Sequence, residues 1–75
     1  GANVRESKNA QSTLDFINKL SIALKEADET AYWLELSYES TILDKQQFES
    51  LYSELSELIA MLTAIIKKNK DNINK

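Results

Sequence analysis

The chain can form helices without interruption, because its sequence contains no proline and its single glycine is the first of 75 residues. Proline and glycine are the residues that break or weaken a helix through the backbone itself. A chain of this length forms at most one domain. The sequence therefore favours an all-α fold, and the spacing of apolar side chains decides where its helices lie and what they pack against.

A first helix is predicted over about residues 13–39. Its apolar residues alternate steps of four and three, which is the spacing of a bundle helix packed along one face. Ser12 is the predicted N-cap, with Asp15 in the acidic position of a capping box. Phe16 and Ala23 widen the apolar seam on one side. The seam itself consists of Thr13, Ile17, Leu20, Leu24, Ala27, Ala31, Leu34 and Tyr38.

A second helix is predicted over about residues 45–67. Asp44 is a good N-cap, and Gln47 stands where its side chain can return a hydrogen bond to the cap. Leu43 and Phe48 have the spacing of a hydrophobic staple across this helix start. The apolar positions of this helix form one broad stripe of Phe48, Leu51, Tyr52, Leu55, Leu58, Ile59, Leu62, Ile65 and Ile66.

The two predicted helices are joined by a short connector, residues 40–44, and followed by a basic tail, residues 68–75. Short connections between helices give antiparallel neighbours. The predicted fold is therefore an antiparallel αα-hairpin. It would be half of an up-down four-helix bundle, which helices outside this sequence or another subunit would complete.

The first helix carries a second apolar face nearly opposite its seam. At 100° per residue, one cluster again steps by four and three. The second helix has one stripe and covers one side of its neighbour, so a second apolar face containing a tryptophan predicts a further contact. We call this cluster the Trp33 stripe; it consists of Ile22, Glu26, Glu29, Trp33 and Leu36.

Four carboxylates near the tryptophan raise the question of a metal or catalytic site. Asp28 and Glu35 point away from the Trp33 stripe and are interpreted as solvated. Glu26 and Glu29 lie one turn apart on one helix, which is not the arrangement of two acids across a cleft. The chain has no histidine for a di-iron motif and no oxygen-rich loop for calcium. Polar contacts within an assembly are the preferred role of Glu26 and Glu29, and no metal or cofactor is expected.

Enzymatic activity is not expected, because the chain has neither histidine nor cysteine to activate a serine and no glycine-rich phosphate loop. A short chain without disulfides is marginally stable, so either self-association or packing against helices outside this sequence is expected. No apolar run approaches the length of a membrane span, and no signal-peptide pattern is present, so a cytoplasmic protein without membrane contact is predicted.

Charge is unevenly placed along the chain, whose net charge is −3. Residues 13–66 are strongly acidic, whereas both ends are basic. An acidic body argues mildly against broad nucleic-acid binding. That binding remains an alternative function, and it would depend on Arg5, Lys8, Lys67, Lys68 and Lys70.

The sequence resembles the four-helix-bundle proteins encoded by 23S rRNA intervening sequences, and their relatives, the accessory variability proteins of diversity-generating retroelements. The densest match is "ALKEA" at residues 23–27, with Glu29-Thr30 and Tyr32-Trp33-Leu34. Further matches are Gly1-Ala2-Asn3, Arg5-Glu6, Asp15-Phe16, Lys19-Leu20, Phe48-Glu49, Glu57-Leu58-Ile59 and Met61-Leu62.

This resemblance implies that the chain corresponds to the last two helices of a four-helix bundle. It also implies a homo-oligomer, a pentamer for the intact protein, while the hairpin alone would pair into a dimer. The retroelement branch binds nucleic acid and a reverse transcriptase through a strongly basic surface, and the acidic body of this chain departs from that pattern.

Overall fold

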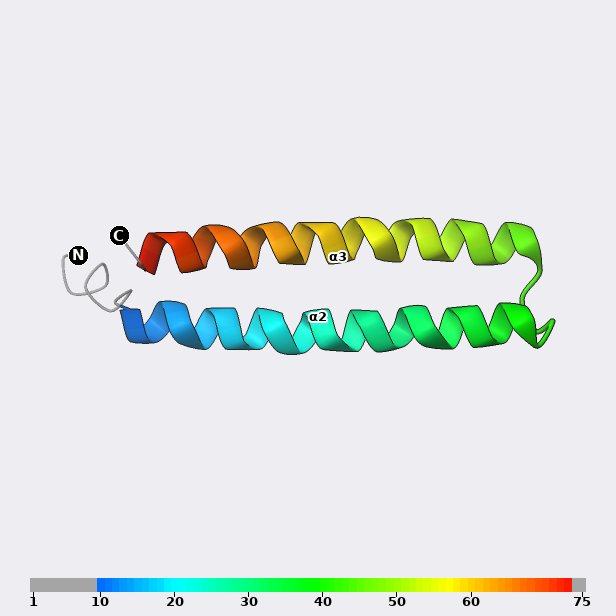
Figure 1. Cartoon of the computed structure of the whole chain (residues 1–75), viewed down its shortest axis with the longest axis horizontal. Coiled ribbons are helices and arrows are strands. Elements are labelled where there is room, and N and C mark those ends of the chain that lie inside the picture. The colour runs from blue at the N-terminus through cyan, green and yellow to red at the C-terminus, as the bar shows by residue number, and fades with distance from the viewer. Residues whose placement is uncertain (1–9, 74–75) are drawn as a thin grey trace.

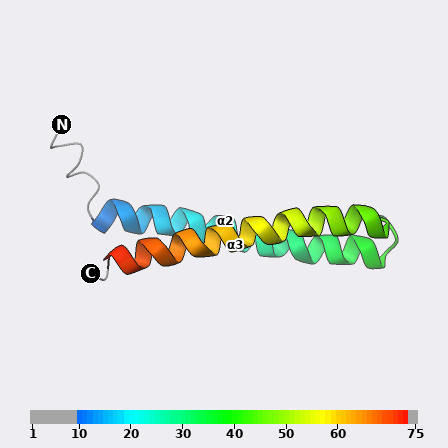
Figure 2. The ribbon, with the colours of Figure 1, turned by 90° about the horizontal axis from the view of Figure 1, so that it is seen from above.

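Two long antiparallel helices make up the computed structural model, which describes residues 10–73. Helix α2 spans Ala10–Glu39 and helix α3 spans Lys45–Ile73. They lie side by side with the connector at one end, and they cross at a shallow angle when seen from above (Figures 1 and 2). The predicted all-α hairpin is confirmed.

The contact between the helices follows the predicted seam. Ile17 and Ala27 of α2 and Leu62 and Ile66 of α3 are the buried apolar residues of the described chain, and the two helices pack against each other. The other seam positions of α2 are half-buried, apart from Tyr38 at the rim. No described side chain is completely enclosed, because two helices cover each other along one line only. The hairpin therefore has a thin core.

Aromatic rings close the connector end of the hairpin. Tyr38 of α2 stacks on Phe48 of α3, with ring centroids 4.6 Å apart and planes inclined by 13°. Phe48 also lies 5.1 Å from the ring of Tyr52, one turn further along α3. Such ring pairs add to the stabilisation from burial. They fix the register in which α3 returns along α2.

Helix α2 ends in a Schellman motif with threonine at its left-handed position. The amide of Ile42 donates to the carbonyl of Ser37 at 2.9 Å, and that of Thr41 donates to the carbonyl of Tyr38 at 3.1 Å. Thr41 has φ of 63°. Glycine usually occupies this position, since a β-branched residue is strained there. Capping chemistry thus ends the helix without glycine or proline.

Replacing Thr41 by glycine is expected to raise the free energy of unfolding by about 0.5–1 kcal/mol. The substitution removes the left-handed strain, which outweighs the greater freedom of glycine in the unfolded chain. Thermal unfolding followed by circular dichroism measures the change. Ser40→Gly is the matched control, because Ser40 has no positive φ to relieve and should lose stability. Equal losses in both variants would contradict the strain at Thr41.

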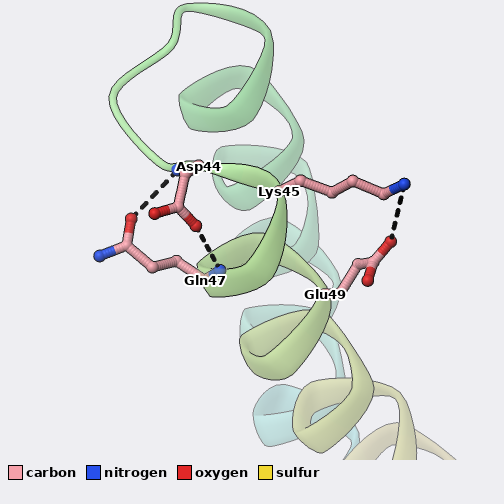
Figure 3. Close-up of polar contacts among 4 residues, drawn as sticks. All are labelled: Asp44, Lys45, Gln47 and Glu49. Carbon is pink, nitrogen blue, oxygen red and sulfur yellow. Dashed lines mark hydrogen bonds and ion pairs between the residues drawn. The ribbon is translucent and has the colours of Figure 1, made fainter.

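The start of α3 is the predicted capping box (Figure 3). The backbone amide of Gln47 donates to Oδ1 of Asp44 at 2.7 Å, and the amide of Asp44 donates to Oε1 of Gln47 at 3.0 Å. Nζ of Lys45 lies 4.0 Å from Oε1 of Glu49, and both side chains are largely exposed. An exposed pair of this kind contributes little to stability. The reciprocal cap is what sets the first residue of α3.

Two predicted boundaries were wrong. Helix α2 is already formed at Ala10, so Ser12 lies inside the helix and is not its N-cap. Helix α3 continues to Ile73, beyond the predicted end near residue 67. Nothing in the backbone interrupts the basic segment, and Lys70 in the last turn suits the negative end of the helix dipole. Half-buried Asn69 and Ile73 also continue the seam to this end.

Within residues 10–73, neither helix combines the length and apolar character that crossing a membrane requires.

Candidate functional site

The Trp33 stripe lies on the outer side of α2. Trp33 and Ile22 are each 62 % exposed, and Glu26 and Glu29 are also exposed. The ring of Tyr32 meets Trp33 edge-on, with centroids 5.5 Å apart and planes at 64°. Tyr32 therefore extends the exposed aromatic surface beyond the stripe. The structure gives this apolar surface no cover within the described residues.

Leu36 differs from the other members of the Trp33 stripe, because it is half-buried. It lies in the last turn of α2, where the connector folds back on the helix. The amides of Ile42 and Leu43 both donate to the carbonyl of Ser37, at 2.9 and 3.2 Å. The exposed part of the stripe therefore ends near Trp33.

The carboxylates near Trp33 do not converge. Across residues 10–73, no three acidic side chains come close enough together to hold a metal ion. Glu35, interpreted as solvated, is exposed but reaches across to the other helix. Its Oε1 accepts a hydrogen bond of 3.2 Å from the hydroxyl of Tyr52. Its role here is to link α2 to α3.

The Glu35 contact raises the pKa of Tyr52 above its usual value of 10.0, through the hydrogen bond first and then through the negative charge and partial burial. The folded state then holds this proton more tightly than the unfolded state. Its contribution to stability is complete below about pH 10 and is lost as the pH rises through the folded-state pKa.

Replacing Glu35 by glutamine is therefore expected to lower the pKa of Tyr52 toward its usual value and to weaken the loss of stability above pH 10. Ultraviolet absorbance of tyrosinate, titrated in the folded protein, measures the pKa. The Tyr52→Phe variant identifies which of the three tyrosines titrates at the highest pH. If the pKa of Tyr52 were unchanged in Glu35→Gln, a group other than Glu35 would hold the Tyr52 proton.

A second exposed apolar surface spans both helices and was not singled out from the sequence. A groove runs between α2 and α3 and is lined by Thr30, Leu34, Leu51, Glu54, Leu55 and Leu58. Leu51 and Leu58 remain 43 % exposed. Phe16 lines a hollow toward the chain termini, and Leu43 lines one beside the connector.

We call this surface the groove face and define it by Phe16, Leu34, Leu51, Leu55 and Leu58. Its sequence signal is the seven-residue repeat of Leu51, Leu58 and Ile65, beside the main seam of α3. The groove face lies on the flank of α2 that carries Phe16, Ala23 and Thr30. The Trp33 stripe occupies another side of that helix, so the hairpin has two separate exposed apolar surfaces.

Charge is divided along the length of the hairpin. The half nearer the connector, residues 25–61, has nine carboxylates and two lysines, a net charge of −7. The other half, residues 10–24 and 62–73, has four lysines and two carboxylates, a net charge of +2. Lys45 and Glu49 form the single ion pair within the described part of the chain. Most of this charge is therefore available to a partner.

The candidate nucleic-acid residues divide into two groups. Arg5 and Lys8 lie outside the described residues. Lys67, Lys68 and Lys70 are exposed in the last turns of α3. At 100° per residue they spread over roughly 160° of the helix circumference. Asp71 lies in the same hollow as Lys67 and Lys68. These lysines therefore do not form a single basic face.

A family model described as "23S rRNA-intervening sequence protein" matches residues 1–64. No curated protein and no solved structure matches the chain.

Proposed function

Because the chain belongs to the 23S rRNA-intervening sequence protein family, we propose that it is a non-enzymatic, cytoplasmic helical-bundle protein that works by assembling with copies of itself. The observation that carries this proposal is the exposure of Trp33 and Ile22 on a hairpin whose core is thin. Large apolar side chains grouped in register are typical of an interaction surface.

Assembly would bury apolar surface that the single hairpin leaves exposed. A domain of this size buries too little surface to be robust, and oligomerisation is one of the few remedies open to a chain without cysteine. The resemblance to pentameric relatives makes a pentamer the expected form of the intact protein, and a dimer the expected form of this hairpin. Glu26 and Glu29 would provide polar contacts at the edge of the interface, where charges set specificity.

The non-enzymatic role rests on side-chain chemistry. The chain has no histidine or cysteine to act as a general base or nucleophile near neutral pH. Its acids on α2 are spread around the helix and are not paired across a cleft. We therefore place the function in the surfaces of the hairpin.

Light scattering on a sizing column tests self-assembly directly. The expected mass is a multiple of the 8.5 kDa chain, and it should fall toward that of one chain on dilution. A folded monomer over the whole accessible concentration range would exclude the proposed function.

The alternative function is nucleic-acid binding by the assembled protein, and it is favoured by the exposed lysines near the end of α3. An oligomer would multiply these weak sites. Phosphate contacts make affinity fall steeply with salt. RNA and DNA titrations at low salt distinguish the functions, since a protein that only self-assembles shows no binding.

A further inference from the structure

We propose that the Trp33 stripe binds an arginine-rich segment of another protein. A guanidinium group of that segment stacks on the indole of Trp33 and pairs with the carboxylate of Glu29. The inference goes beyond self-assembly, because it names a different partner for the same surface. A second copy of this chain would compete with that partner.

The stripe places an aromatic ring beside two carboxylates. Glu29 stands one turn before Trp33 on α2, Glu26 lies a turn before Glu29, and all three side chains are exposed. Long side chains on a helix point back toward its N-terminus, so the indole of Trp33 lies over the turn that carries Glu29. Within residues 10–73, neither Glu26 nor Glu29 takes part in an ion pair. Both charges therefore remain available to a cation that approaches the ring.

The indole is already restrained before a partner arrives. The ring of Tyr32 meets it edge-on, with centroids 5.5 Å apart and planes at 64°. Edge-to-face pairs of this kind are stabilising, and a side chain that is already ordered loses less entropy on binding. Trp33 remains 62 % exposed despite this contact. The ring is thus held in place and still accessible.

An exposed tryptophan beside carboxylates fits arginine better than any other side chain. A cation above an aromatic ring is attracted by the ring quadrupole, and tryptophan gives the strongest interaction. The guanidinium group is planar and weakly hydrated, so it can stack on the ring while its N–H groups donate to a carboxylate. The ammonium group of lysine is strongly hydrated and cannot stack in this way.

The surrounding charge decides which class of partner can approach. The half of the hairpin nearer the connector has a net charge of −7. Lys25 is the only base between residues 20 and 44, and at 100° per residue it lies roughly 80° around the helix from Trp33. The phosphates of nucleic acids and of lipid headgroups would be repelled. Two copies that met through their Trp33 stripes would bring two acidic surfaces together, whereas a basic protein segment neutralises the charge.

The first experiment titrates a hexa-arginine peptide into the full chain at low ionic strength. The emission of Trp33, the only tryptophan in the chain, reports directly on the proposed site. Hexa-arginine should change this emission and bind about two- to fivefold more tightly than hexa-lysine, which carries the same charge. Added salt should weaken both peptides. Equal affinity for the two peptides, or an unchanged emission with hexa-arginine, overturns the proposal.

The second experiment removes one carboxylate at a time. Glu29→Gln should weaken hexa-arginine binding about two- to fivefold, the effect of losing one exposed ion pair. Glu57→Gln is the matched control, because it removes the same charge from an exposed position of α3 nearly opposite the buried Ile66. The control should change the affinity little, and circular dichroism checks that both variants remain helical. Equal weakening in both variants would mean that binding follows net charge alone, and it overturns the site.

The third experiment locates the contact by the chemical shifts of backbone amides. Hexa-arginine should shift the amides of residues 26–36 more than those of the acidic part of α3. Trp33→Leu should reduce these shifts, and Trp33→Phe should reduce them less, because phenylalanine keeps an aromatic face. Larger shifts along α3, or equal effects of the two substitutions, overturn the role of the indole.

The outcomes keep this inference separate from the proposed function. A native chain that stays monomeric but binds hexa-arginine at Trp33 excludes the proposed function, while the inference stands. If the emission of Trp33 changes on dilution of the chain but not on addition of hexa-arginine, a second copy occupies the stripe and the inference is overturned. An RNA oligonucleotide that changes this emission where hexa-arginine does not would also overturn it.

Discussion

Replacing Leu62 by alanine is expected to lower the free energy of unfolding by about 2–4 kcal/mol. Leu62 is 8 % exposed, near the middle of the contact between α2 and α3. Removing a buried leucine loses its transfer free energy and leaves a cavity. A 75-residue chain has a total stability of about 4–11 kcal/mol, so the variant loses a large part of it. Thermal or urea unfolding at a fixed protein concentration measures the change.

Leu14→Ala is the control for this effect. Leu14 has the same side chain on α2 but is 46 % exposed, and its removal should cost less than about 1 kcal/mol. Protein concentration must match, because association adds to the apparent stability of both variants. Equal losses at Leu62 and Leu14 would show that the seam between the helices is not the core of the protein.

Replacing Trp33 by alanine should weaken the assembly while the hairpin keeps its helicity. A tryptophan at the centre of an interface typically contributes about 2 kcal/mol, which corresponds to roughly a thirtyfold weaker association. Trp33 contributes little to the contact with α3, because it lies on the opposite side of α2. Light scattering gives the association and far-ultraviolet circular dichroism gives the helicity.

Ile42→Ala is the matched control for Trp33→Ala. Ile42 is the most exposed large apolar residue described, but it lies in the connector, away from both helical surfaces. Its removal should leave the association unchanged. If Trp33→Ala instead lost helicity at an unchanged association constant, Trp33 would belong to the fold and the predicted interface would be wrong.

The hairpin could be predicted because the sequence features that specify it, the apolar spacing and the helix caps, are local or periodic. The steps of four and three along α2 identified the residues that pack against α3. The reciprocal hydrogen bonds of Asp44 and Gln47 set the start of α3 at Lys45. The start of α2 and the end of α3 were predicted wrongly, because a serine or a lysine run tolerates helix as well as loop. Ser12 is inside α2, and the basic segment up to Ile73 remains helical.

The two exposed surfaces differ in how far the sequence revealed them. The Trp33 stripe lies opposite the seam, so spacing on one helix was enough to predict its exposure. The groove face depends on which flanks of α2 and α3 come together. That requires the direction in which α3 returns beside α2, which the periodicity of either helix alone does not contain. The sequence alone therefore places Leu51 and Leu58 in one broad stripe with the residues that face the first helix.

The stacked rings at the connector set an order in which the hairpin can form. Tyr38 and Phe48 are ten residues apart, and Glu35 and Tyr52 are 17 apart, so these contacts close short loops. The pairs at the far end close loops several times longer, at a greater entropic cost when formed first. If the helices pair progressively outward from the connector, each new contact closes only a short additional loop. Proteins whose contacts are local in this sense fold rapidly. We therefore expect folding of the hairpin to begin at the connector, where polar caps stabilise the turn between the two helices.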